Sequence, residues 1–117
     1  MKKVFHLKKC GTCQKILQRY DLGGWEIREI KSKPLSAQEL EQMCELAGSY
    51  EALFSKRSTQ IRARNIETQT LSEDEFRDLL LDHYSFLKRP VFITGDKIFI
   101  GNDKKSIAAL DEFFGIE

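Results

Sequence analysis

Two cysteines near the start of the chain are the residues whose type and spacing most clearly suggest chemistry. Cys10 and Cys13 lie three positions apart in the stretch FHLKKCGTCQKIL, between a short apolar run and a segment with helical periodicity. Such a pair is compatible with half of a metal site, with a redox pair, or with two small residues packed in a core. The elements that surround the pair decide among these three interpretations.

The apolar pattern places Cys10 at the junction between a strand and a helix. Residues 3–7 form a short apolar run that favours a strand. After the first cysteine, apolar residues recur at the spacing of one helix face, at Cys13, Ile16, Leu17 and Tyr20. A helix N-terminus presents unpaired amides and positive partial charge, which stabilise a thiolate and lower the pKa of its thiol. Cys10 is therefore the candidate nucleophile.

The residues after Cys10 could take part in its chemistry. Gly11 would let the backbone approach the sulfur or a bound anion closely, because glycine has no side chain. Cys13 lies one helical turn beyond Cys10 and could attack a mixed disulfide formed there, which would close an intramolecular disulfide. Cys13 also belongs to the apolar helix face, so a purely structural role for it stays open.

A metal site would need a second pair of ligands at a regular spacing. The remaining candidates, Cys44 and His83, are far apart in the sequence, and each occupies an apolar position of a predicted helix. We therefore expect no metal ion, and we expect Cys44 to lie in the core.

A histidine and an arginine could support the cysteine. His6 precedes Cys10 by four residues on the predicted strand. A lone strand histidine is commonly packed or solvent-facing, but this one could hydrogen-bond the thiol or help to depress its pKa. Arg89 is followed by Pro90 and a predicted strand, so a rigid turn would hold its guanidinium. An arginine near a thiolate and a helix N-terminus makes an anion site.

The order of the predicted elements indicates a mixed sheet with helices packed on it. The elements are a strand at 3–7, a helix after Cys10, a strand at 25–30, helices between 36 and about 86, a hairpin of strands 91–94 and 97–100, and a final helix capped by Asn102 or Asp103. The last helix before the hairpin is expected to include His83 on its apolar face and to end at Pro90. A βαβ unit implies a parallel strand pair, and the hairpin adds antiparallel strands. The fold class is therefore α/β with a four-stranded mixed sheet.

The composition limits the classes of protein to be considered. The chain has 117 residues, 41% of them hydrophobic, and a formal net charge of +1. Its length predicts one domain, and its balanced charge argues against direct nucleic-acid binding. No apolar run reaches about 18 residues, so we expect no membrane span. No signal peptide is evident. Three cysteines do not favour a disulfide framework, so we expect a reducing, cytoplasmic setting. The charge balance suggests a monomer.

Motifs spread along the chain resemble one known family. They are HLKKCGTC near the N-terminus, LFSKRS at 53–58, KRPVFIT at 88–94 and FIGND at 99–103. Together they resemble the ArsC-like superfamily, which includes glutaredoxin-coupled arsenate reductases and Spx-type transcription regulators. The resemblance covers essentially the whole chain. It implies a thioredoxin-like fold in one domain over 1–117, with a helical insertion at about 36–86 and a cis peptide bond at Pro90 beside Cys10.

The resemblance also assigns roles to residues around the cysteine. In arsenate reductases of this type, a histidine stands four residues before the nucleophilic cysteine, and Gly-Thr follows that cysteine. The residues that match this pattern are His6, Cys10, Gly11 and Thr12. The resemblance implies that glutathione with glutaredoxin supplies the reducing thiols and that no cofactor is bound.

The resemblance is incomplete at the arginines that surround the oxyanion in these reductases. Arg89 matches the arginine before the proline, and Arg57 corresponds approximately to the one in the middle of the chain. The third falls at about Gly101 or Asn102, where this chain has no arginine. A charge-assisted hydrogen bond is worth roughly 1.5–3 kcal/mol, so its loss would weaken oxyanion binding roughly tenfold or more.

Three functions are compatible with these features. The first is a thiol-dependent reductase in which Cys10 attacks arsenate, a glutathione mixed disulfide or a protein disulfide. The second is a Spx-like regulator in which a Cys10–Cys13 disulfide changes binding to the α subunit of RNA polymerase. The third is a family member that keeps the fold as a binding domain. The reductase is the leading hypothesis, with Cys10, Cys13, Arg89 and His6 as its catalytic residues.

Overall fold

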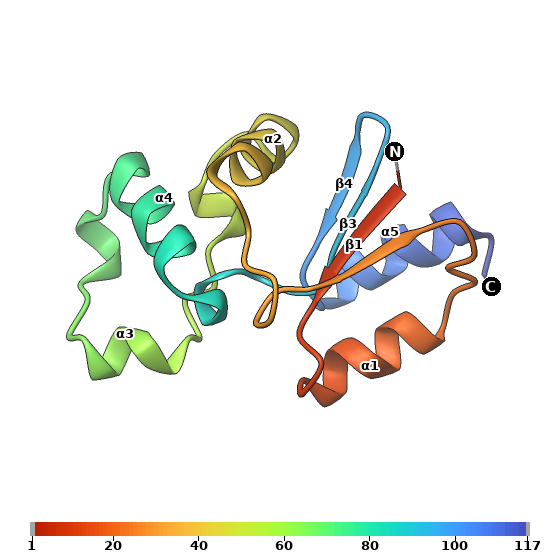
Figure 1. The fold of residues 1–117 in the computed structure, drawn as a ribbon, viewed down its shortest axis with the longest axis horizontal. Coiled ribbons are helices and arrows are strands. Elements are labelled where there is room, and N and C mark those ends of the chain that lie inside the picture. The colour runs from red at the N-terminus through yellow and green to blue at the C-terminus, as the bar shows by residue number, and fades with distance from the viewer. Residues whose placement is uncertain (1, 117) are drawn as a thin grey trace. The chain divides into compact units, whose positions relative to one another are not determined.

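The computed structural model describes residues 2–116, which form two compact units (Figure 1). The sheet unit consists of the chain up to Lys33 together with the chain from Arg89 onward, and the helical unit is Pro34–Lys88. The insertion predicted at 36–86 falls inside the helical unit. Each unit is described separately below, and the single-domain organisation stays a prediction.

The sheet unit contains four strands in the order β2-β1-β3-β4. The strands are β1 (Lys2–His6), β2 (Glu26–Glu29), β3 (Val91–Thr94) and β4 (Lys97–Ile100). β1 pairs with β2 in parallel, while β1–β3 and β3–β4 are antiparallel. The mixed four-stranded sheet predicted from the sequence is confirmed.

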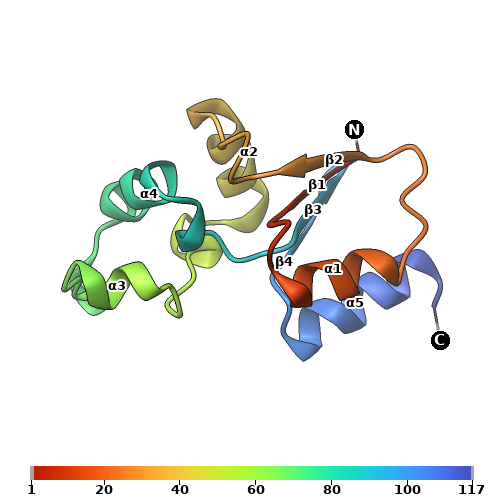
Figure 2. The ribbon, with the colours of Figure 1, turned by 60° about the horizontal axis from the view of Figure 1, so that its bottom comes forward.

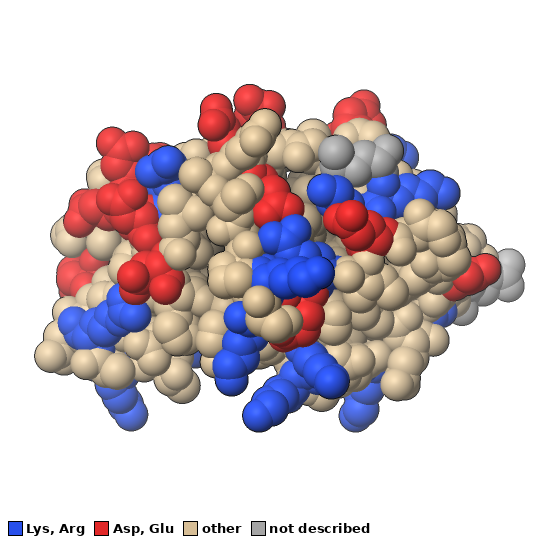
Figure 3. All heavy atoms as spheres, viewed as in Figure 1, with Lys and Arg blue, Asp and Glu red and all other residues tan. Residues whose placement is uncertain are grey.

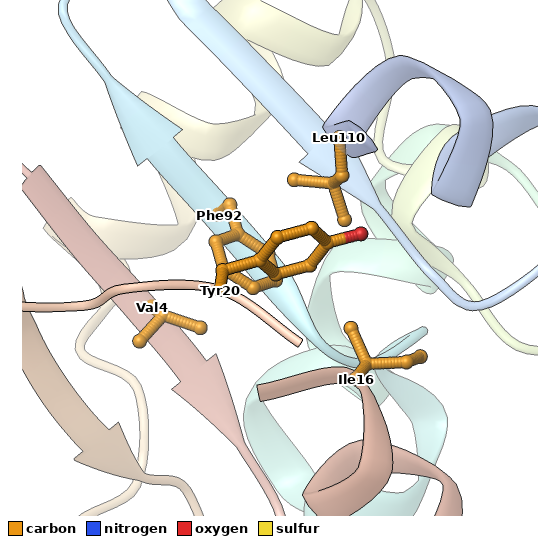
Figure 4. Packing of buried hydrophobic residues seen from close by; sticks show 5 residues of the cluster. All are labelled: Val4, Ile16, Tyr20, Phe92 and Leu110. Atoms are coloured by element: carbon orange, nitrogen blue, oxygen red, sulfur yellow. The ribbon is translucent and has the colours of Figure 1, made fainter. Parts of the chain in front are cut away.

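Helices α1 (Gly11–Gln18) and α5 (Lys104–Phe114) lie on the same face of this sheet (Figure 2). The core between them and the sheet is formed by the residues shown in Figure 4, which are Val4, Ile16, Tyr20, Phe92 and Leu110. The Tyr20 hydroxyl donates to Asp111 Oδ1 at 2.7 Å, which ties the end of α1 to α5. This packing fixes the first turn of α1 beside the end of β1.

The alternation of side chains along β1 determines which residues meet α1. Val4 is fully buried in the core under the helices, and it is paired with Phe92 of β3. His6 is two residues further along, so its side chain leaves the same face of the sheet. β1 therefore delivers His6 to the helix face just before the chain turns toward Cys10.

The helical unit contains three α-helices and three short 3₁₀ turns among the described residues. They are α2 (Ala37–Ala47), η1 (Glu51–Leu53), α3 (Thr59–Ala63), η2 (Thr68–Thr70), α4 (Glu73–Asp82) and η3 (Tyr84–Phe86). A capping box begins each of the two longer helices of this unit: Ser36 and Glu39 satisfy each other's backbone amides at the start of α2, and Ser72 and Glu75 do so at α4.

Two expectations about the helical unit are wrong. Cys44 is only half-buried, because the buried stripe of α2 runs through Leu40 and Met43 and leaves Cys44 at its flank. α4 does not include His83 on a helix face and does not extend to Pro90. His83 adopts an extended backbone after Asp82, and its Nδ1 accepts the Ser85 amide to begin η3.

Charged side chains of both signs share the surface seen in Figure 3. This mixture agrees with the formal net charge of +1 and with the absence of a strongly basic composition. Among the described residues, no helix combines the length and the apolar character needed to cross a membrane.

Candidate functional site

The site is built around Cys10, which is the N-cap residue of α1. The Cys10 amide donates to the Leu7 carbonyl at 3.1 Å, which closes a turn between β1 and α1. The Cys10 sulfur then accepts the backbone amide of Cys13, with an N···S distance of 3.4 Å. The sulfur therefore occupies the place that a serine or aspartate oxygen takes in an ordinary N-cap, where a negative charge is stabilised.

Several groups compete to set the pKa of the Cys10 thiol. Burial raises this pKa. Hydrogen bonds from the amide and the side chain of Cys13, together with the guanidinium of Arg89, lower it by more than burial raises it. The net effect is a pKa below the ordinary value of a thiol. Cys10 is also half-buried rather than fully enclosed, so a reaction partner can reach it.

Cys13 has the opposite environment. Its side chain is fully buried, and burial raises the pKa of its thiol to about 12, with the neighbouring Cys10 adding to the rise. Cys13 is therefore a protonated thiol at neutral pH, beside a cysteine that ionises readily. Both cysteines are free in this structure. The pair is asymmetric, because Cys10 is an accessible thiol with a lowered pKa and Cys13 is a buried thiol with a raised pKa.

The cation of the site comes from the start of β3. The peptide bond between Arg89 and Pro90 is cis. The Asn102 side chain donates to the Arg89 carbonyl at 3.2 Å, and the Gly101 amide donates to the Pro90 carbonyl at 2.9 Å. Gly101 and Asn102 are the positions at which the resemblance places a third arginine. In this chain they hydrogen-bond to the backbone of Arg89 and Pro90 and supply no further positive charge.

His6 has a partner on α1. It is 8% exposed, and its Nδ1 lies 3.3 Å from Nε2 of Gln14. Burial lowers the pKa of His6, an effect that Glu29 partly opposes. The ring is therefore neutral at neutral pH, and Nδ1 can accept the Gln14 amide hydrogen. A direct role of His6 in depressing the Cys10 pKa stays a prediction.

The lowered pKa of His6 predicts a pH-dependent stability. The unfolded chain takes up a proton near pH 6.5 while the folded chain resists it, so the free energy of unfolding should fall as the pH drops below 6.5. His6→Asn, which keeps an acceptor near Nδ1, should remove part of this fall. Denaturant unfolding of both proteins between pH 5 and pH 8, a range of about three pH units around the histidine pKa, measures it. An identical pH profile in the variant would contradict the assignment.

The other predicted site residues lie in two places. Gly11 and Thr12 form the exposed first turn of α1, directly after Cys10. A Cβ atom built on Gly11 would meet no atom within 4 Å beyond its chain neighbours and the nearby backbone of α1, so the rest of the protein leaves that space open. Arg57 is exposed and belongs to the helical unit, where its amide donates to Ser55 Oγ. The part of Arg57 in anion binding stays a prediction.

Sequence reasoning missed three residues that support the site. Glu29 accepts the Lys8 amide, Gln14 donates to the Lys8 carbonyl, and Asn102 supports Arg89. Asn102 lies in the FIGND motif, but its contact with the Arg89 backbone was not predicted, and Glu29 and Gln14 belong to no recognised motif. The available signal was position, because Glu29 and Asn102 lie near the ends of predicted strands and Gln14 lies one turn after Cys10 in the predicted helix.

The comparisons with known proteins identify the family. The model of the ArsC family matches residues 5–110. The chain belongs to the ArsC family. Among curated relatives, the uncharacterized protein YusI of Bacillus subtilis is 33% identical over 98 residues, which covers 80% of this chain and 83% of YusI. The global transcriptional regulator Spx of Lactiplantibacillus plantarum is 28% identical over 108 residues, covering 89% of this chain and 81% of Spx.

Solved structures of this family share the fold. An arsenate reductase from Vibrio cholerae superimposes with a TM-score of 0.74 over 94% of this chain and 95% of that one, at 16% identity. At this identity the likeness concerns the fold alone. The fold of this ArsC-family chain is thioredoxin-like, with the strand order described above and a helical segment between its two halves.

Proposed function

We propose that this ArsC-family protein is a thiol-dependent reductase in which Cys10 is the nucleophile. The observation that carries the proposal is the placement of the Cys10 sulfur at the N-cap of α1, where it accepts the Cys13 amide and meets the charge of Arg89. These contacts stabilise the thiolate, which is the nucleophilic form of cysteine.

The asymmetric pair suggests how a disulfide substrate would be reduced. The Cys10 thiolate attacks one sulfur of the substrate, forms a mixed disulfide and releases the other sulfur as a thiolate. Cys13 then gives its proton to solvent or to the leaving thiolate and attacks Cys10. That step closes a Cys10–Cys13 disulfide, releases the second substrate thiol, and leaves the protein oxidised by two electrons. Glutathione, directly or through glutaredoxin, would restore both thiols.

An oxyanion substrate would use the same first residue. The Cys10 sulfur bonds to the arsenic of arsenate, and water leaves. A second thiol, from Cys13 or glutathione, attacks the Cys10 sulfur, so that arsenite is released and a disulfide remains. Arg89 would hold the negative charge of the substrate, with Arg57 as a second candidate. The chain lacks the third arginine of the family pattern, so we expect weaker arsenate binding than a three-arginine site gives.

An activity assay distinguishes these substrates. Arsenate, a glutathione mixed disulfide and a model protein disulfide are offered separately to the wild type, with glutathione and glutaredoxin as the reductant. Turnover of at least one substrate above the background without protein is expected, in keeping with a protein that works in the reducing cytoplasm. Absence of turnover with all three would count against the reductase.

A regulatory function is the second candidate, because Spx regulators are among the relatives and the Cys10–Cys13 pair could serve as a switch. In that case oxidation to the Cys10–Cys13 disulfide changes binding to the α subunit of RNA polymerase. A pull-down with that subunit, using reduced and oxidised protein, tests it. Binding that depends on the redox state would favour the regulator over the reductase.

The open space beside Gly11 gives a prediction that separates folding from substrate binding. Gly11→Ala should leave the free energy of unfolding unchanged or raise it by up to about 1 kcal/mol, because alanine favours a helix more than glycine does. If an anionic substrate contacts this backbone, the new methyl group should raise KM roughly tenfold, the cost of one charge-assisted hydrogen bond. Denaturant unfolding and steady-state kinetics measure the two effects. An unchanged KM would mean that the substrate does not approach Gly11.

A further inference from the structure

The backbone of Lys8 is held by side chains from two other elements. Its amide donates to Oε2 of Glu29 at 3.0 Å, and its carbonyl accepts Nε2 of Gln14 at 3.2 Å. Lys8 lies inside the turn that runs from Leu7 to Cys10. The charged end of Lys8 is not needed for either contact, because both involve its backbone.

Glu29 is well placed for this contact. It is the last residue of β2 and stands opposite His6 in the parallel ladder, so its side chain starts beside the end of β1. Its Oε1 accepts the amide of Ser32 at 2.7 Å and the hydroxyl at 2.9 Å, which leaves Oε2 for Lys8. The Lys8 amide is the largest of the influences that lower the pKa of Glu29 to about 2. The carboxylate is therefore charged at every physiological pH.

Gln14 completes the arrangement from the helix side. Its side-chain nitrogen lies near both the Lys8 carbonyl and Nδ1 of His6, at 3.2 and 3.3 Å. An amide NH₂ group has two hydrogens, so it can donate to both acceptors at once. The neutral state of His6 described above is the state that permits this. Glu29 from β2 and Gln14 from α1 thus hold the backbone amide and the backbone carbonyl of one residue, Lys8, between them.

We infer that Glu29 and Gln14 are positioning residues that hold the Leu7–Cys10 turn and thereby keep the Cys10 sulfur opposite the Cys13 amide and Arg89. The inference rests on the proposed role of Cys10 as a nucleophile. One residue, Lys9, separates Lys8 from Cys10, so a displaced Lys8 backbone moves the sulfur relative to the first turn of α1. The N···S contact of 3.4 Å then weakens, and the thiolate loses part of its stabilisation.

The test measures the reactivity of Cys10 as a function of pH. Alkylation by iodoacetamide is followed from about pH 4 to pH 9.5 in a Cys44→Ala background, where Cys13 stays protonated because its pKa is about 12. Gln14→Met removes the donor without changing the charge, and Glu29→Gln removes one acceptor oxygen. Each should raise the Cys10 pKa by about 0.5, which leaves roughly threefold less thiolate at a pH below the pKa.

The direction of the change in Glu29→Gln separates positioning from a simple charge effect. A nearby carboxylate that acted only through its charge would disfavour the thiolate, so its removal would lower the Cys10 pKa. A positioning role predicts a rise despite the lost charge. Glu26→Gln is the matched control, because Glu26 lies on the same strand and contacts Lys3 instead. Gln18→Met, in the exposed last turn of α1, is the control for Gln14.

Two further measurements keep the outcome clear. Circular dichroism verifies that each variant folds, and if Glu29→Gln does not, Gln14→Met decides. In the double variant the two pKa increases should not add, because both residues hold the backbone of the same residue, Lys8. Unchanged or lowered pKa values in folded single variants, or fully additive increases, would overturn the inference. An ordinary thiol pKa in the wild type would instead overturn the proposed function.

Discussion

Replacing Cys10 by serine should abolish the reductase activity. The hydroxyl of serine does not ionise near neutral pH and cannot form a disulfide, so the first step of each proposed reaction loses its nucleophile. We expect the rate to fall by roughly a thousandfold or more, to the background of the thiol reductant alone, since removal of a covalent nucleophile acts on that scale. The measurement is turnover of whichever substrate the wild type reduces. The fold should survive, because Cys10 is half-buried and serine is itself a preferred N-cap residue.

Cys44→Ser supplies the matched control for this change. Cys44 is also a half-buried free cysteine, but it lies in α2 of the helical unit, and burial together with Glu73, Glu45 and Glu41 raises the pKa of its thiol. This variant should keep the wild-type rate. Full activity in Cys10→Ser, or a comparable loss in Cys44→Ser, would show that the proposed nucleophile is wrong.

Replacing Arg89 by glutamine should raise the pKa of Cys10 and slow its reaction. The guanidinium stabilises the thiolate through its charge and through a hydrogen bond, and glutamine keeps only a donor. An opposite charge near an ionisable group shifts its pKa by one unit or more, so we expect a rise of about one, which leaves roughly tenfold less thiolate at a pH below the pKa. Absorbance of the thiolate in the ultraviolet, with Cys10→Ser as the blank, gives the pKa directly.

Two other variants show whether the charge of Arg89 is the cause. Arg89→Lys keeps the charge but loses the planar fork, so its Cys10 pKa should lie between those of the wild type and Arg89→Gln. Arg19 is an arginine of the same unit that is engaged with Asp111, and Arg19→Gln should leave the Cys10 pKa unchanged. Equal pKa values in the wild type and Arg89→Gln would remove Arg89 from the account of the thiolate.

The parts of the fold that follow from local patterns were predictable from the sequence. The spacing of Ile16 and Tyr20 indicated α1, and the pair Gly95–Asp96 between two β-prone runs indicated the β3–β4 hairpin. Cys10 could be placed at the start of α1 because a strand pattern ends and a helix pattern begins around it. These features depend on residues close together in the chain, where periodicity and turn chemistry carry information.

Features that depend on tertiary contacts were not predictable in the same way. The flank position of Cys44 reflects which stripe of α2 is buried, and a one-residue rotation around the helix axis changes it by about 100°. Glu29 is an ordinary charged residue at the end of an exposed strand until β1 and β2 pair in register. Gln14 can donate a hydrogen bond to the Lys8 carbonyl only once α1 has packed on the sheet. Hydrogen bonds between polar side chains and residues far away in the chain produce no periodic pattern in the sequence.

Trapping the first covalent intermediate tests the central claim most directly. Reduced Cys13→Ser protein is mixed with glutathione disulfide, and the modified residue is located by peptide mass spectrometry. We predict one glutathionyl group on Cys10, which persists because the resolving thiol is absent, while the wild type passes on to a Cys10–Cys13 disulfide without accumulating the adduct. Two results would contradict the assignment of Cys10 as the nucleophile. One is an adduct found only on Cys44, and the other is no adduct on Cys10 at a pH where glutathione itself undergoes thiol–disulfide exchange.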